Sequence, residues 1–158
     1  MSRLPTLGPR GEGWVFLQIV LFGLIVLAGT LGPAWTGAAR AITGVVGAVA
    51  IAAGALLAVK GVLDLRENLT PLPHPKSGNR LVERGAYRYV RHPIYGGLML
   101  AAGGWGLWTA SLPALGMTVV LLVFFDLKSR REEHWLQARH PDYAAYRSRT
   151  RRFFPLIY

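Results

Sequence analysis

Residues 85–95 read GAYRYVRHPIY and stand directly before an apolar run that continues to about residue 111. This stretch is basic, aromatic and polar in a chain of which 52% is hydrophobic. A polar segment that leads into a membrane-length apolar run lies where water meets lipid. We therefore expect the stretch to sit at a membrane surface, covered by a second polar piece from the C-terminal part of the chain.

Composition predicts an all-α polytopic membrane protein with a single domain, 1–158, because long apolar runs alternate with basic loops and only 16% of residues are charged. The net charge of +10 would suggest nucleic acid as a partner of a soluble protein. Here we expect the cations to face anionic lipid at the cytoplasmic ends of helices, with no nucleic-acid partner. The lack of cysteine excludes disulfides and Cys-ligated metals. The polar N-terminus does not resemble a signal peptide, so we expect the first apolar run to be retained.

Four apolar runs predict about four membrane spans, at about 14–35, 41–63, 94–111 and 114–127. The helical pattern of the fourth run continues through KSRREEHWLQAR, which predicts one long helix that leaves the membrane near Asp126. A further short helix should follow it. The second run is rich in small residues, and we expect them to mark close helix packing rather than a ligand groove. They are Gly44, Gly47, Ala48, Ala52, Gly54 and Ala55.

Lysine and arginine are dense in the connection 64–91 and in the segment 128–158, sparse between the first two runs, and absent from the turn before the fourth run. Because positive charge gathers on the cytoplasmic side, this alternation predicts that both segments and both termini are cytoplasmic. The topology therefore brings two polar clusters to one face of the membrane. The first comprises Tyr87, Arg88, Arg91, His92 and Tyr95, and the second comprises Glu132, Glu133, His134, Tyr143, Tyr146, Arg147, Arg151 and Arg152.

Glu132 and Glu133 are the acids of the second cluster. Adjacent side chains on a helix point about 100° apart, so we expect only one of them to face inward. Either acid alone could belong to a solvated helix face that makes weak ion pairs. Their position beside the membrane and opposite a basic loop favours a functional role. The histidine spacings match no zinc or iron site, so no metal is expected.

The stretch GAYRYVRHPIYGG resembles the G-x-Y-x-x-V-R-H-P-x-Y-x-G signature of isoprenylcysteine carboxyl methyltransferase-like membrane enzymes, which are related to phospholipid N-methyltransferases. Downstream, RREEHWLQARHPDYAAYRSRTRRFFP resembles their E-E-x-x-L and Y-x-x-Y-x-x-x-x-x-R-x-x-P tail, and the likeness extends from about Asn68 to Pro155. The chain departs from the family in having Ala86 where Pro is common. It also has no G-x-G in 41–63, which speaks against the phospholipid branch.

The resemblance implies S-adenosylmethionine-dependent methyl transfer to a lipophilic small molecule or lipid-modified substrate that enters from the membrane lipid. It implies catalytic roles for Arg91 and Glu133, with Glu133 or Glu132 meeting the amino group of the cofactor, and Arg147, Arg151 or Arg152 closing the site. The cofactor-binding residues that it implies are Leu81, Val82, Gly85, Tyr87, Val90, His92, Tyr95, Glu132, Tyr146 and Arg147.

The surplus of arginine slightly favours a carboxylate acceptor, which an arginine can hold, over an amine, which would need a carboxylate base. Two other classes stay open. Membrane sterol reductases, which bind NADPH, share an R-H-P-x-Y-like segment and a C-terminal form like FFPLIY. A non-enzymatic membrane scaffold is the third class. The sequence leaves the acceptor and the oligomeric state undetermined.

Overall fold

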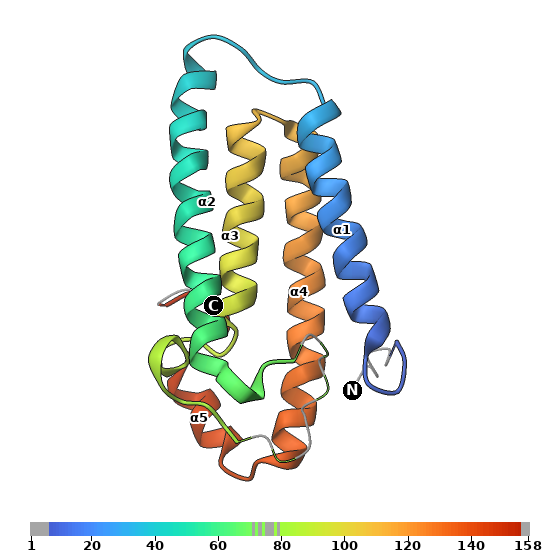
Figure 1. Cartoon of the computed structure of the whole chain (residues 1–158), viewed down its shortest axis with the longest axis vertical. Coiled ribbons are helices and arrows are strands. Elements are labelled where there is room, and N and C mark those ends of the chain that lie inside the picture. Colours follow the sequence, from blue (N-terminus) through green and yellow to red (C-terminus); the bar gives the residue numbers. More distant parts are fainter. Residues whose placement is uncertain (1–6, 71, 73, 75–77, 79, 156–158) are drawn as a thin grey trace.

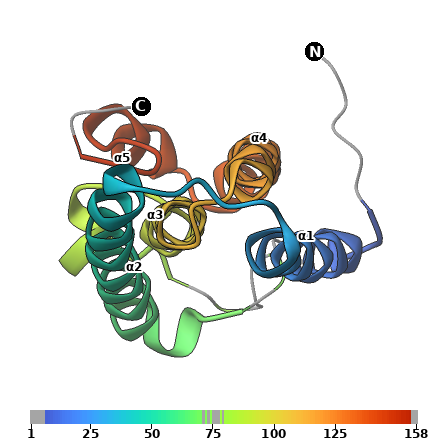
Figure 2. The same cartoon turned by 90° about the horizontal axis from the view of Figure 1, so that it is seen from above.

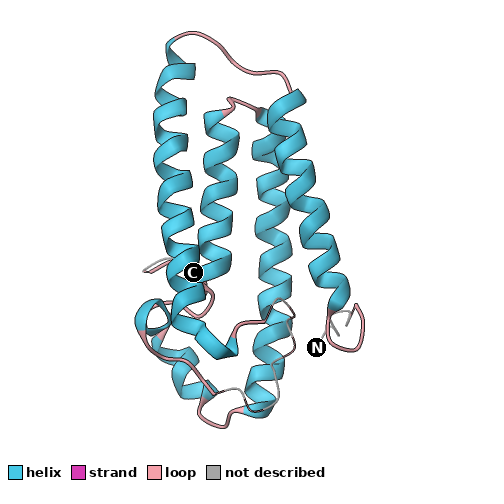
Figure 3. Cartoon of the chain, viewed as in Figure 1, coloured by secondary structure: helices cyan, strands magenta, loops and turns pink. Residues whose placement is uncertain are grey.

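The computed structural model describes residues 7–70, 72, 74, 78 and 80–155. This part of the chain is all-helical, as predicted, with two isolated β-bridges in place of sheets. Figure 3 shows the helices and the loops that join them. The helices are α1 (Glu12–Leu31), α2 (Ala38–Leu65), α3 (Pro93–Trp108), α4 (Leu112–Arg139) and α5 (Tyr143–Arg149), with 3₁₀ turns η1 (Arg66–Asn68) and η2 (Gly85–Arg88).

The four long helices run side by side along the long axis, and α5 with the loop segments lies at one end (Figure 1). Seen from above, they follow the order α2, α3, α4, α1 (Figure 2). α2 packs against α3, α3 packs against α4, and α1 packs mainly against α4. Helices α1 and α2 are therefore neighbours in sequence but not packing partners. The start of α1, the loop after α2 and the C-terminal segment all lie at the same end of the bundle.

In the part of the chain that the structure describes, three helices are long and apolar enough to cross a membrane: α1, α2 with its continuation through η1, and α4. Large apolar side chains such as Phe16, Val45 and Val119 are exposed on their outer faces, as lipid contact requires. α3 has 16 residues, about 24 Å at ~1.5 Å per residue, which is less than the ~30 Å of a hydrocarbon core. The prediction of four spans thus holds for three, and the crossing by α3 and the cytoplasmic orientation stay predictions.

Some helix boundaries differ from the predicted spans. α1 ends at Leu31 rather than near Trp35 because Pro33 disfavours helical geometry in the residue before it. The indole of Trp35 instead donates to Thr43 Oγ1 at 3.1 Å. The prediction that α4 continues as one helix, with a short helix after it, is confirmed. Predictions that concern residues 1–6, several positions of the Pro-rich loop and Leu156–Tyr158 of FFPLIY lie outside the described residues.

Glycines hold α2 close to α3. A Cβ atom on Gly54 would lie 2.5 Å from the carbonyl oxygen of Gly97, and one on Gly97 would collide in the same way with the carbonyl oxygen of Gly54. Gly47 and Gly104 form a second such pair, one repeat of seven residues away along both helices. Close helix packing through small residues is therefore confirmed at these positions. Gly44 differs, because a Cβ atom added there would meet nothing within 4 Å in the part of the chain that the structure describes.

Candidate active site

The segment that opens α3 is paired with the C-terminal segment through backbone hydrogen bonds. Arg91 N donates to Arg151 O at 2.8 Å, and His92 N donates to Arg152 O at 2.9 Å. The return bond runs from Arg151 N to Tyr89 O at 3.1 Å. The C-terminal piece therefore covers the GAYRYVRHPIY stretch, as the sequence predicted. His92 precedes Pro93, the first residue of α3, where a missing N–H has no cost.

The turn before this segment is held by the end of α2. Asp64 accepts a hydrogen bond from Ala86 N at 2.7 Å. Gly85 has φ +60°, and a Cβ atom there would collide with the Asp64 carboxylate. Glycine is required at this position both for the backbone angle and for the close approach. Gly85 thus shapes the loop and lies away from the cavity described below.

Glu133 is buried at the centre of a cluster of cations. Its Oε1 accepts from Arg91 Nε at 2.8 Å and lies 3.2 Å from His92 Nε2. Arg152 Nε approaches Oε1 to 3.5 Å, and Arg147 Nε approaches Oε2 to 3.7 Å. A buried carboxylate is stable only with such partners. Glu133 therefore joins α4 to the signature segment and to the C-terminal segment.

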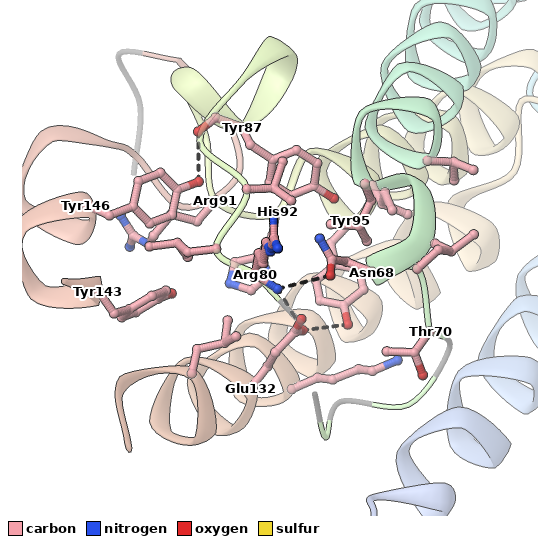
Figure 4. A pocket seen from close by; sticks show the side chains of 18 of the residues that line it. Asn68, Thr70, Arg80, Tyr87, Arg91, His92, Tyr95, Glu132, Tyr143 and Tyr146 are labelled. Carbon is pink, nitrogen blue, oxygen red and sulfur yellow. Dashed lines mark hydrogen bonds and ion pairs between the residues drawn. The ribbon is translucent and has the colours of Figure 1, made fainter. Parts of the chain in front are cut away.

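Glu132 faces a different way. Its Oε2 accepts from Tyr95 OH at 2.9 Å and lies 3.7 Å from His92 Nδ1 (Figure 4). Both acids therefore have partners within the protein, on different sides of α4. Glu133 points to the arginines, and Glu132 lines a cavity. The imidazole of His92 lies between the two carboxylates and stacks on Tyr95, with ring centroids 5.3 Å apart.

A cavity of about 310 Å³ opens beside Glu132, near the lower end of the ~300–1,000 Å³ typical of small-molecule sites. Its polar lining includes Arg80, Lys128 and Tyr143, from the loop, α4 and α5, and its apolar lining includes Val15, Val62 and Leu98, from α1, α2 and α3. Predicted residues that line it are Leu81, Val82, Tyr87, Arg91, His92, Tyr95, Glu132 and Tyr146. Predicted residues that do not line it are Gly85, Val90, Glu133 and Arg147.

Three buried tyrosines form the loop side of this cavity (Figure 4). Tyr146 OH donates to Tyr87 O at 2.7 Å, which fixes α5 against the loop. Tyr143 OH is buried without a hydrogen-bond partner in the part of the chain that the structure describes. Burial raises the pKa of Tyr87, Tyr143 and Tyr146, so all three phenols stay protonated at neutral pH. A bound ligand could satisfy the Tyr143 hydroxyl.

Some lining residues outside the predicted cofactor-binding set carry recognisable signals in the sequence. Lys128 precedes Glu132 by one helical turn and so shares its face of α4. Gln18 is an isolated amide inside the apolar run of α1. Tyr143 belonged to the second polar cluster without an assigned role. Asn68, Thr70 and Arg80 also line the cavity. Their position in the connection after α2 could not by itself have predicted this.

Residues 42–142 match the family model described as phospholipid methyltransferase, which is more than half of the chain. The chain belongs to the phospholipid methyltransferase family. The predicted resemblance is thereby confirmed for the signature and for the E-E-x-x-L part of the tail, and the match ends before Tyr143. The lack of G-x-G in the second apolar run does not exclude the chain from this family. The match includes the loop, α3 and all of α4, so both Glu132 and His92 lie within it.

Two curated proteins are similar to this member of the phospholipid methyltransferase family. The cobalt-zinc-cadmium resistance protein CzcN of Cupriavidus metallidurans is 37% identical over 86 residues, covering 52% of this chain and 38% of that protein. The nickel-cobalt-cadmium resistance protein NccN of Alcaligenes xylosoxydans xylosoxydans is 26% identical over 144 residues, covering 90% of this chain and 62% of that protein. The chain thus spans less than two thirds of either relative. Within the described ranges, no group of three or more His, Cys, Asp or Glu could hold a metal ion.

Proposed function

We propose that this protein transfers a methyl group from S-adenosylmethionine to a lipophilic acceptor at the membrane surface. The observation that carries the proposal is the cavity, which is lined both by polar side chains such as Glu132 and by apolar side chains of the helices such as Val62. Family membership supports the same reaction class. A substrate with a polar reactive group and an apolar tail matches this arrangement.

The residues of the polar part fit the cofactor. Glu132 offers a carboxylate to an ammonium group, and the Tyr143 hydroxyl offers a buried hydrogen-bonding group without a partner in the described part of the chain. The rings of Tyr87 and Tyr146 offer aromatic faces to a purine or a sulfonium cation. We assign the amino-group contact to Glu132 rather than Glu133, because Glu133 is enclosed by arginines and lies outside the cavity lining.

Bound there, S-adenosylmethionine would supply a methyl carbon activated by its sulfonium sulfur. Methyl transfer needs alignment of the acceptor and exclusion of water more than covalent help. We propose that Arg91 and Glu133 act by positioning: they hold the loop, α4 and α5 in register around the site. The catalytic roles implied for them by resemblance thus become roles in building the cavity, while Arg91 also contributes to its wall.

The apolar part provides an access route for a lipid. Val15 of α1 and Val62 of α2 both line the cavity, although these two helices do not pack against each other. We propose that the acyl chain of the acceptor enters between them. This route supports a membrane lipid or a lipid-modified molecule as the substrate, in accord with the family.

The surplus of arginines no longer favours a carboxylate acceptor. Arg91 is engaged by Glu133 and by the carbonyl oxygen of Thr150, and Arg152 pairs with Asp126. An amine acceptor could use Glu132 as a base, whereas a carboxylate acceptor needs none. The choice between carboxylate and amine therefore depends on other groups in the cavity.

Cofactor binding by the purified full-length chain in neutral detergent tests the proposal. We expect S-adenosylhomocysteine to raise the midpoint of thermal unfolding, and NADPH to leave it unchanged. Radiolabelled methyl groups from S-adenosylmethionine should then appear in a lipid extract. Stabilisation by NADPH alone would identify a sterol-type reductase. Stabilisation by neither nucleotide would support a membrane scaffold.

The names of the two similar proteins motivate a further part of this proposal, namely that lipid methylation contributes to metal tolerance. Deletion of the gene should then sensitise its host to cobalt or cadmium, and the wild-type gene should restore growth. Glu132→Gln, made to weaken cofactor binding, should fail to restore it. If an inactive variant fully restores growth, metal tolerance does not depend on methyl transfer.

A further inference from the structure

Lys128 is a buried cation that the proposed reaction does not use. Lys128 is 1% exposed, and its Nζ donates a hydrogen bond to Gln18 Oε1 at 2.5 Å. The ammonium also lies over the rings of Tyr95 and Phe125, 5.2 and 6.0 Å from their centroids. Removing an ammonium from water is costly unless it is paired with an anion. A neutral amide and two aromatic faces compensate only part of that cost.

The carboxylate on the same face of α4 does not form an ion pair with Lys128 in the described part of the chain. Glu132 is one turn further along α4 and directs Oε2 to Tyr95 and His92. Lys128 and Gln18 nevertheless line the same cavity as Glu132. Within the described residues, Lys128 thus presents an ammonium with unused donors to a space that a ligand can enter.

The position of this pair within the cavity indicates which ligand it serves. Lys128 precedes Glu132 by four residues, about 6 Å along the axis, toward the bundle interior. Leu98, one turn after Tyr95 on α3, lies further into the bundle and lines the cavity, whereas Val15, one turn before Gln18 on α1, lies nearer the loop end. The ammonium lies over the ring of Tyr95, so it stands between Glu132 on the loop side and the apolar Leu98 on the interior side. The polar group of an amphiphile would occupy this position when its chain lies among the helices.

We propose that Lys128 and Gln18 bind the anionic oxygen group of the acceptor lipid, a carboxylate or a phosphate diester. The inference rests on the proposed function, because it takes the ligand to be the methyl acceptor. Lys128 supplies a charge-assisted hydrogen bond, and the amide of Gln18 supplies a second donor from the opposite helix. A carboxylate held here would itself be the acceptor, one turn from Glu132. A phosphate held here would anchor a phospholipid whose headgroup extends toward Glu132.

Direct lipid binding tests the inference independently of methyl transfer. The probes are a pyrene-labelled fatty acid, a pyrene-labelled phosphatidylethanolamine and a pyrene-labelled fatty alcohol, each titrated into the full chain in neutral detergent. We expect at least one anionic-oxygen probe to bind more tightly than the alcohol. Preference for the fatty acid would identify a carboxylate, and preference for the phospholipid would identify a phosphate. Equal affinity for all three probes would overturn the inference.

Three variants sharpen the test. Lys128→Met keeps the side-chain length without charge and should weaken the preferred anionic probe by roughly ten- to hundred-fold. Lys128→Arg should retain most of the binding. Gln18→Glu should also abolish the preference, because its carboxylate would neutralise Lys128 while preserving the contact between α1 and α4. This second neutralising variant keeps the inference testable if Lys128→Met does not fold.

S-adenosylhomocysteine binding separates the two proposals. We expect Lys128→Met and Gln18→Glu to bind it within about two-fold of wild type while losing the anionic lipid. A parallel loss of cofactor and lipid affinity in both variants would overturn the inference and assign Lys128 to the cofactor. If the wild-type chain binds no S-adenosylhomocysteine but binds anionic lipid through Lys128, the methyltransferase proposal fails and the lipid site stands.

Discussion

Arg91 Nε donates to Glu133 Oε1 at 2.8 Å although the two residues are 42 positions apart. The same guanidinium donates through Nη1 to Thr150 O at 2.5 Å and to Arg147 O at 3.2 Å. One side chain thus connects the signature segment to α4 and to the end of α5. This connection holds three walls of the cavity together. Substitutions in the connection should therefore lower stability, whereas substitutions in the cavity lining should lower ligand affinity.

Replacing Glu133 should destabilise the fold. Glu133→Gln leaves Arg91, Arg152 and His92 without their shared anion, and breaking a buried ion pair in this way costs about 3 kcal/mol. Denaturant titration in detergent, followed by circular dichroism, measures the loss. The matched control is Glu83→Gln, whose partner Arg149 is exposed, and which should cost less than about 1 kcal/mol. Equal stability of the two variants would contradict the central role of Glu133.

Replacing Glu132 should affect binding rather than stability. Glu132→Gln retains an oxygen that can accept from Tyr95 but removes the charge that faces the cavity. We expect the affinity for S-adenosylhomocysteine to fall at least about ten-fold, as for a lost charge-assisted hydrogen bond. The unfolding midpoint should stay close to that of Glu83→Gln. Unchanged affinity in isothermal titration would remove Glu132 from the cofactor site.

Replacing Gly54 should separate α2 from α3. The added methyl group of Gly54→Ala would meet Gly97 O at 2.5 Å and Ala101 N at 2.7 Å, and backbone atoms cannot rotate away. Overpacking of this kind costs roughly 1–3 kcal/mol. Gly44→Ala on the same helix has open space and should be neutral or stabilising by up to about 1 kcal/mol. Thermal unfolding of both variants provides the comparison, and a reversed order would refute the packing.

Two tyrosine variants distinguish a ligand group from a structural one. Tyr146→Phe leaves Tyr87 O without its donor and should cost about 1–3 kcal/mol of stability. Tyr143→Phe removes a buried hydroxyl that has no partner within the described ranges, so stability should be unchanged or increased. Its affinity for S-adenosylhomocysteine should nevertheless fall roughly two- to ten-fold. If Tyr143→Phe binds the cofactor normally, its hydroxyl has no role in binding.

Most of the helical framework was predictable, because hydropathy over a window of residues is a local property. The start of α3 at Pro93 and the continuation of α4 to Arg139 follow from such local signals. The length of α3 did not, because residues 109–111, which belong to the same apolar run, form a turn. There Ala110 has φ +53° and Ser111 accepts from Ala114 N.

The candidate site was only partly predictable. Arg91, His92, Tyr95 and Glu132 come together as the two polar clusters predicted. The roles of Glu132 and Glu133 could not be separated, since helix geometry sets the angle between them but not which neighbours each one meets. Gln18 and Lys128 were missed because each has its partner 110 positions away in the sequence. Nothing local shows whether a lone polar side chain will meet such a partner.

Local sequence properties were sufficient to determine a helical membrane protein whose polar loop precedes α3, because hydrophobic run length and proline position act within a few residues. The tertiary structure alone decided that Glu133 is enclosed, that Glu132 faces the cavity, and that Lys128 stands beside Gln18. Those facts depend on how α1, α4 and the C-terminal segment approach one another. Burial and ion pairing arise only once segments distant in sequence exclude water together.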